Sequence, residues 1–370
     1  MITVVVAGAM ATKPGNAGNA WSRLGWTAAF RQLGFDVWFV EEVPLGPGRA
    51  EAIAWASAVG ARHALADRML FAEPGDERLR ELVASSAMTL NISGHLGIGD
   101  LGVAGRRRQL VFLDDDPGFT QIWAAQGSRG CRLPGHDLHL TFGANIGTPS
   151  CPLPTNDLIW HPVRPPVFLD DWTVTPAAEP DRITTVTSWR APFGAVTWNG
   201  RTYPLKHHEF RKLLPLPRLA PAIYDIAMPI DPAEAPDLVA LEAHGWIVSD
   251  AAEVARSTER YQDWILRSGA EVSAAHGVYA ETASGWISDR TTAYLASGRP
   301  AVVQSTGFGA TIPTGEGLLT FDDVNGAAKA VRSVLADYDR HAKAARTVAE
   351  ELFDAVAIAS YVCELAGVSP

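Results

Sequence analysis

The stretch Glu281–Gly309, ETASGWISDRTTAYLASGRPAVVQSTGFG, places a loop, a helix-like segment and a β-branched run in close succession. Ser288 or Asp289 is a suitable N-cap and Gly298 suits the position after the last turn, so we predict a helix of about nine residues. The amides of a first helical turn point outward with positive dipole character, so a phosphate could bind there. An ordinary loop-helix-strand unit explains the spacing equally well.

The N-terminal part of the chain alternates between strand-like and helix-like segments. Residues 2–8, ITVVVAG, form a continuous apolar run, which is typical of a strand buried on both faces. Residues 20–34 have helical spacing and end at a glycine, and residues 35–42 are the next predicted strand. Three further β-like runs follow, namely MTLNIS, QLVFLDDD and LHLTFG. This alternation predicts a parallel sheet with right-handed crossovers.

A proline-dense stretch separates this series from a second one. Eight prolines fall between residues 149 and 180, and we take residues 162–181 as the linker. The runs RITTVTSW, AIYDIAM, GWIVSD, AVVQS and LLTF then indicate a second set of strands with helical segments among them. We therefore predict the α/β class, with Rossmann-like domains at 1–165 and 166–350 facing each other across a ligand-binding cleft.

Composition narrows the class of protein. The 370 residues carry a formal net charge of -10, which argues against a broad nucleic-acid surface but allows a local basic pocket for an anionic small molecule. Three cysteines, Cys131, Cys151 and Cys363, form no disulfide framework and favour a reducing cytoplasm. No apolar run approaches about 20 residues, so no membrane span is predicted. The 12 tryptophans serve as core anchors, and a minority could stack on a flat ligand.

The segment 281–323 resembles the donor-site signature of the GT-B glycosyltransferases. Glu281, seven residues and Asp289 precede the run ASGRPAVV, and GEGLL followed by FDD occurs at 315–323. The order of elements along the chain is also similar. The resemblance implies a GT-B fold with the acceptor in the first domain and a nucleotide-sugar donor in the second. It further implies that a C-terminal helix, 351–370, packs back on the first domain.

The resemblance also implies roles for individual residues. Glu281 would lie by the donor sugar and Asp289 by the nucleotide ribose. The loop between them would meet the diphosphate, assisted by basic side chains and by the loop that follows AVVQ. Cations are needed because the diphosphate departs as a polyanion. The donor-binding candidates are Arg190, Lys206, Ser284, Gly285, Trp286, Ser288, Asp289, Arg290, Ser305, Thr306 and Gly307. No metal or further cofactor is implied.

The loop Lys13–Asn19 follows the first strand and lacks the pattern G-x-G-x-x-G of dinucleotide-binding proteins. Its Gly15, Gly18 and Asn19 are candidates for contact with donor phosphate or acceptor, although a simple turn is an equal alternative. Glu41 and Glu42 end the second strand, where the ribose-binding acid of a dehydrogenase would sit. Without the glycine pattern, a dehydrogenase is disfavoured.

Two residues are candidates for the base that deprotonates an acceptor hydroxyl. His95 lies among glycines after a strand end, and Asp100 could orient or replace it. Asp116 is the second candidate, at the end of the run 114–116, DDD. That run has two other readings, a helix cap and the metal-binding DxD of GT-A glycosyltransferases.

Metal and nucleophile motifs are otherwise weak in this sequence. His136 and His139 lie near two cysteines, but no Cys-x2-Cys pair accompanies them, so we predict no zinc site. We therefore predict a glycosyltransferase that uses a nucleotide-sugar donor and a small-molecule acceptor. A nucleotide-sugar epimerase and a non-catalytic nucleotide-sugar-binding protein are the alternatives, and the oligomeric state is left open.

Overall fold

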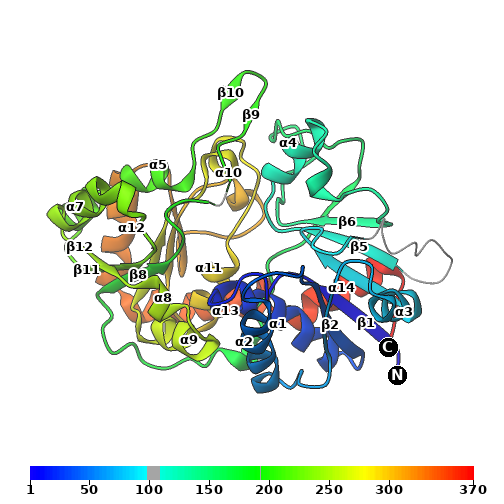
Figure 1. Cartoon of the computed structure of the whole chain (residues 1–370). Coiled ribbons are helices and arrows are strands. Elements are labelled where there is room, and N and C mark those ends of the chain that lie inside the picture. Colours follow the sequence, from blue (N-terminus) through cyan, green and yellow to red (C-terminus); the bar gives the residue numbers. More distant parts are fainter. Residues whose placement is uncertain (98–108, 192) are drawn as a thin grey trace.

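The computed structural model describes residues 1–97, 109–191 and 193–370. Two parallel sheets, each flanked by helices, form the cores of two halves of the chain (Figure 1). The first sheet has seven strands in the order β3-β2-β1-β4-β5-β6-β7, and the second has six in the order β12-β11-β8-β13-β14-β15. The predicted α/β class with two Rossmann-like sheets is therefore confirmed.

The described part of the first half contains seven strands and the four α-helices α1 to α4. Its strands are β1 (Thr3–Ala7), β2 (Asp36–Glu42), β3 (Met69–Ala72), β4 (Met88–Ile92), β5 (Gln109–Asp114), β6 (Leu138–Thr141) and β7 (Trp160–Pro162). Its helices are α1 (Ala17–Gln32), α2 (Arg49–Arg62), α3 (Glu77–Ser85) and α4 (Phe119–Ala125). Val4, Val5 and Val6 of β1 are completely buried, as expected for a central strand covered on both faces.

The second half is built around six parallel strands. These are β8 (Arg182–Val186), β11 (Ile223–Ala227), β12 (Trp246–Ser249), β13 (Ala270–Ser273), β14 (Ala301–Gln304) and β15 (Leu318–Phe321). A small antiparallel hairpin, β9 (Thr197–Trp198) and β10 (Arg201–Thr202), projects from this half (Figure 1). The α-helices of this half that precede the three C-terminal ones are α5 (Lys206–Arg211), α6 (Leu216–Leu219), α7 (Ala235–Ala243), α8 (Ala251–Val254), α9 (Thr258–Arg267), α10 (Gly277–Glu281) and α11 (Asp289–Ala296).

Three helices end the chain: α12 (Val324–Ala336), α13 (Tyr338–Leu352) and α14 (Ala355–Ala366). Helices α12 and α13 are separate because Asp337 between them leaves the helical conformation, with φ -148° and ψ 64°. The C-terminal helix expected at 351–370 is α14, which begins after Asp354, whose side chain caps it by accepting the amide of Val356. Of the helices that the structure describes, none is long and apolar enough to cross a membrane.

The chain passes between the halves at two places that lie side by side. The amide of Val167, in the linker after β7, donates to the carbonyl of Phe353, and the amide of Ala355 donates to the carbonyl of Val167. Beyond this point α14 packs on α1 of the first half (Figure 1). This pair of crossings brings the carboxyl ends of both sheets to one shared cleft.

Candidate functional site

A cavity of about 490 Å³ lies between the two halves and takes its lining from both. The first half contributes the loop after β1, the start of α1 and the end of β5. The second half contributes the segment after β8 and the starts of α5 and α11. The carboxyl ends of parallel strands are where open α/β sheets bind ligands, and the volume is in the range of small-molecule sites.

Charged side chains of both signs line this cavity. Its cations are Lys13, Arg23, Lys206 and Arg290, and its acids are Asp115, Asp116 and Asp289. Among the lining side chains, four cations face three acids, whereas the whole chain has a net charge of -10. The cleft is therefore much less acidic than the protein as a whole, which suits an anionic ligand.

Lys206 and Arg290 form the basic wall of the second half. The Nζ of Lys206 donates to Thr187 Oγ1 at 2.9 Å, and burial together with Arg290 lowers its pKa to about 8. The Nη1 of Arg290 donates to the carbonyl of Val186 at 3.1 Å, and its Nε lies 2.7 Å from Oε1 of the buried Glu271. Burial opposes the charge of Arg290, but Glu271 raises its pKa, so this residue stays cationic.

The predicted helix after residue 288 is confirmed, and it begins at the cavity. The side chain of Ser288 caps α11 by accepting from the Arg290 amide at 3.3 Å, and Gly298 has a φ of +67° after the helix. Trp286, Ser288 and Asp289 line the cavity beside Arg290. The first-turn amides of α11 therefore add to the basic wall.

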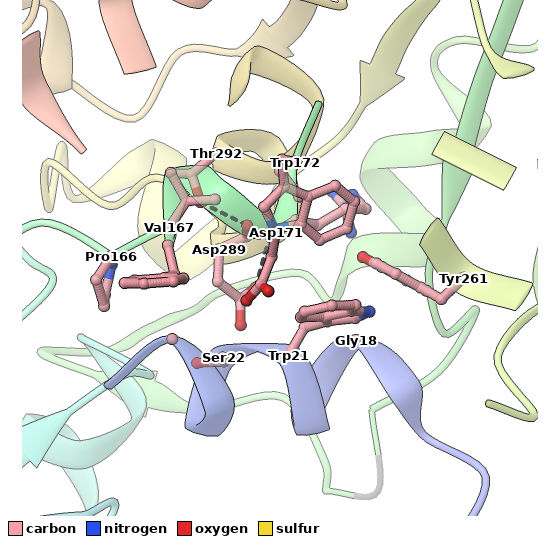
Figure 2. A pocket seen from close by; sticks show the side chains of 14 residues that line it. Gly18, Trp21, Ser22, Pro166, Val167, Asp171, Trp172, Tyr261, Asp289 and Thr292 are labelled. Carbon is pink, nitrogen blue, oxygen red and sulfur yellow. Dashed lines mark hydrogen bonds between the residues drawn. The ribbon is translucent and has the colours of Figure 1, made fainter. Parts of the chain in front are cut away.

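A second, smaller cavity adjoins the first beneath the start of α11. It holds about 20 Å³, which is room for a single water. Figure 2 shows that the carboxylates of Asp171 and Asp289 point into it, above Trp21 and Ser22 of α1. Asp289 also accepts the Arg290 amide at 2.8 Å, so it acts as a helix cap, and its predicted contact with a ribose stays a prediction.

The other loop residues predicted to bind the donor do not line the cavity. Gly285 packs on Ala144 and Asn145 of the first half, and its amide donates to the Thr306 carbonyl at 2.7 Å. The Asn145 side chain donates to the carbonyls of Ala283 and Gly307 at 2.8 and 3.2 Å. These loops are used to join the halves. The residues outside the cavity lining are Ser284, Gly285, Ser305, Thr306 and Gly307.

Glu281 and Arg190 also lie apart from the cavity lining. Glu281 ends α10 rather than lying in a loop, and its Oε2 is 2.5 Å from Nη2 of Arg201 in the hairpin. Arg190 is exposed and pairs with Glu234 at 2.7 Å. The resemblance that suggested donor-site roles for Glu281 and Arg190 does not show in which direction their side chains point.

The loop after β1 is held by an internal carboxylate. Glu41 Oε2 accepts the amides of Met10 and Ala11 at 2.7 and 2.6 Å, and Oε1 accepts the amide and hydroxyl of Thr12 at 2.7 and 2.5 Å. The amides that would face a dinucleotide phosphate are therefore occupied by the protein itself. This contact further disfavours a dehydrogenase, in which an acid at the position of Glu41 would bind a ribose.

The three predicted contact residues reach the cavity, Gly15 from the loop and Gly18 and Asn19 from the first turn of α1. The side chain of Asn19 donates to the Ala9 carbonyl at 2.5 Å, so it also ties the start of α1 to the loop that follows β1. These three residues thus lie where a substrate could meet them.

The three consecutive aspartates after β5 have different environments. Asp114 is completely buried, accepts from Gln121 and Thr141 at 2.8 Å each, and has a pKa raised to about 7 by burial. Asp115 pairs with Arg23 at 3.0 Å, and although burial opposes its charge, Arg23 holds its pKa below the usual value. Because Asp114 points into the core, Asp114 and Asp116 do not form a metal-binding DxD pair.

Of the two predicted bases, Asp116 lines the cavity and His95 does not. Burial, and then the neighbouring Asp115, raise the pKa of Asp116. Burial and the nearby Arg23 lower the pKa of His95 to about 4, so His95 is neutral at pH 7. Asp100, suggested as its partner, lies outside the described residues.

The histidine pair near the cysteines is part of the core. His136 and His139 both lie within hydrogen-bond distance of the Leu133 carbonyl, at 3.0 and 3.3 Å. Among the residues that the structure describes, no group of three His, Cys, Asp or Glu side chains is arranged to hold a metal ion.

Sequence reasoning missed Lys13, Arg23 and Asp115 as cavity residues. Arg23 is 3% exposed within an otherwise apolar helix face. The available signal in the sequence was that Arg23 is the single charged residue of the run AWSRLGW. An arginine that is buried requires a charged or polar partner, so a site acid near it could have been expected.

No protein-family model and no curated protein sequence matches this chain. Solved glycosyltransferase structures, however, match its fold over almost the whole length. One is AviGT4, a glycosyltransferase involved in avilamycin A biosynthesis, with 14% identity, a TM-score of 0.58 and coverage of 99% of this chain and 97% of that one. Another is Alr3699/HepE of Anabaena in complex with UDP and glucose, with 11% identity, a TM-score of 0.62 and coverage of 99% and 100%.

A third match is an α-glucosyltransferase in complex with UDP and a 13-mer DNA containing an HMU base. It has 11% identity, a TM-score of 0.64 and coverage of 99% of this chain and 98% of that one. Identities this low establish the fold and nothing finer. The fold is the two-domain GT-B arrangement, as the segment 281–323 suggested.

Proposed function

We propose, from this GT-B fold and its charged cleft, that the chain transfers a sugar from a nucleoside-diphosphate sugar to a small-molecule acceptor. The observation that carries the proposal is the convergence of Lys206, Arg290 and the start of α11 on one cavity between the halves. Two fixed cations and the positive end of the α11 dipole stabilise a departing diphosphate, which gains negative charge as the anomeric bond breaks.

In this reaction the wall formed by the second half binds the departing diphosphate, and the wall formed by the first half binds the acceptor. The bond between the anomeric carbon and the diphosphate oxygen breaks, and the acceptor oxygen forms the new bond to that carbon. Asp116, on the opposite wall from Lys206, takes the proton of the acceptor hydroxyl. Arg23 and Lys13 keep the neighbouring Asp115 ionised, so Asp115 orients polar groups of the acceptor rather than exchanging protons.

Isothermal titration calorimetry with UDP, GDP, ADP and TDP tests the donor site. At least one diphosphate should bind, and Lys206→Ala should weaken it by about tenfold or more, since a hydrogen bond to a charged group contributes about 1.5–3 kcal/mol. The matched control is Lys329→Ala, an exposed lysine on α12 outside the cavity lining. Absence of binding by every diphosphate would refute the proposal.

Incubation of nucleotide sugars without an acceptor separates transfer from the alternatives. A transferase releases free sugar slowly as water replaces the acceptor, whereas an epimerase accumulates the epimeric nucleotide sugar. A binding protein without catalysis does neither. Asp116→Asn should reduce sugar release while leaving diphosphate affinity within about twofold, because Asp116 contacts the acceptor side of the cleft.

A further inference from the structure

An aromatic pair of the second half donates hydrogen bonds to two consecutive residues of the first half. The Tyr279 hydroxyl, on α10, donates to Oδ1 of Asp116 at 2.6 Å. The indole Nε1 of Trp286 donates to the backbone carbonyl of Asp115 at 3.3 Å. The two rings are in contact in a tilted arrangement, with centroids 4.4 Å apart and planes inclined by 34°. The end of β5 is thus held by side chains from the opposite side of the cleft.

We propose that Tyr279 is a positioning residue that holds the Asp116 carboxylate in its working orientation only when the two halves are closed. The inference rests on the proposed function, in which Asp116 is the base. Tyr279 and Asp116 belong to different halves, so their hydrogen bond exists only at this separation of the halves. A base oriented by closure avoids proton transfer before both substrates are enclosed.

The phenol is well suited to hold a carboxylate because it cannot turn away. Tyr279 is 1% exposed, and its ring lies against Phe119, His276 and Trp286, with centroid distances of 5.8, 5.4 and 4.4 Å. Phe119 belongs to α4 of the first half, so the ring is packed from both sides of the cleft. A donor fixed in this way costs little reorganisation when the reaction occurs.

The same aromatic pair is connected to the donor side of the cavity. Trp286 lies two residues before Ser288, which caps α11, and four before Arg290. A shift of α11 on binding a diphosphate therefore moves Trp286 and the Tyr279 ring that contacts it. The backbone from Arg290 to Trp286, this ring contact and the hydrogen bond of Tyr279 link occupation of the basic wall to the position of Asp116.

Several charged and polar groups face Asp116, and they determine the direction in which its pKa shifts when Tyr279 is replaced. Burial, and then Asp115 on the same strand end, raise its pKa, whereas the Tyr279 hydroxyl, Lys13 and Lys206 lower it. Asp114 also contacts this residue, since its Oδ1 accepts the Asp116 amide at 3.2 Å. Loss of the phenol must therefore raise the pKa of Asp116 further, and less of the carboxylate is ionised at neutral pH.

Carbon-13 NMR of aspartate-labelled protein measures this shift directly. The Asp116 carboxyl signal is assigned by its absence in Asp116→Asn, which also separates it from the titrating Asp114. In Tyr279→Phe its midpoint should move to higher pH. The control Tyr338→Phe removes a hydroxyl that donates to the Gly269 carbonyl at 2.8 Å, away from the cleft, and should leave the midpoint unchanged. An unchanged midpoint in Tyr279→Phe would overturn the inference.

Sugar release from the donor supplies the second readout. In Tyr279→Phe, kcat should fall between about tenfold and a hundredfold while KM for the nucleotide sugar stays within about twofold, and the acid limb should move to higher pH. A wild-type rate with an unchanged limb would contradict the positioning role. If wild type releases no sugar although the Asp116 midpoint shifts, the proposed function fails instead.

Discussion

The Nε atom of Arg290 lies 2.7 Å from Oε1 of Glu271, and both side chains are buried, at 9% and 0% exposure. Glu271 lies on β13, so the pair fixes a cation of the cavity to the central part of the second sheet. Within the described residues, Oε2 of Glu271 has no hydrogen-bond partner. Arg290 is therefore the main compensation for this buried carboxylate.

Glu271→Gln should lower the free energy of unfolding by about 3–5 kcal/mol, because it leaves a buried guanidinium without its counter-charge. Urea denaturation measures the loss. The control is Glu350→Gln, which breaks the equally short but exposed pair of Glu350 with Arg346, also 2.7 Å. That change should cost about 1 kcal/mol or less. Equal losses in both variants would contradict the buried-pair interpretation.

Diphosphate affinity should fall as the pH rises through about 8, because burial and Arg290 lower the pKa of Lys206 to about 8. A bound anion favours the charged lysine and raises its pKa, so the contribution of Lys206 is complete below 8 and is lost above it. Calorimetry with UDP from pH 6.5 to 9.5 measures this decline. Lys206→Arg should flatten it, since a guanidinium stays charged over the range. A pH-independent affinity in the wild type would exclude a direct role for Lys206.

Much of the fold could be predicted from sequence because its signals are local. The buried run of β1, the N-cap Ser288 and the glycine after α11 each determine structure within a few residues. Helix ends marked by a single aspartate are harder to predict. Asp337 and Asp354 interrupt stretches whose apolar spacing continues, so periodicity alone does not show where α12 ends or where α14 begins.

The site was only partly predictable, because residue order does not give side-chain direction. Lys206 and Arg290 reach the cavity, whereas Arg190 pairs with Glu234 at the surface. Lys13 and Arg23 escaped notice because their role depends on Asp115, which is distant along the chain. Contacts across the cleft require both halves to be placed, and no local pattern records that placement.

Gly285 is closely packed in the contact between the halves. It has a φ of +80°, and a Cβ at this position would lie 2.9 Å from the Cβ of Ala144 and from the Asn145 amide. Gly285→Ala should therefore separate the halves as well as strain the backbone, with a thermal midpoint several degrees below that of the control. The control Gly75→Ala has a similar φ of +84° but no atom within 4 Å, so it reports backbone strain alone. Equal midpoints would show that the close approach is unimportant.

Glu281 either forms a surface ion pair with Arg201 or contacts the donor sugar, and variants of the two residues distinguish these roles. Their side chains are 25% and 60% exposed, and neither residue lines the cavity. Glu281→Ala should therefore leave UDP affinity within about twofold and cost about 1 kcal/mol or less of stability, as expected for a solvent-exposed pair. Arg201→Ala removes the same contact from the hairpin side and should behave alike in calorimetry and in sugar release. A much larger loss of sugar release in Glu281→Ala than in Arg201→Ala would instead place the Glu281 carboxylate at the donor sugar, since only a direct contact with substrate separates the two variants.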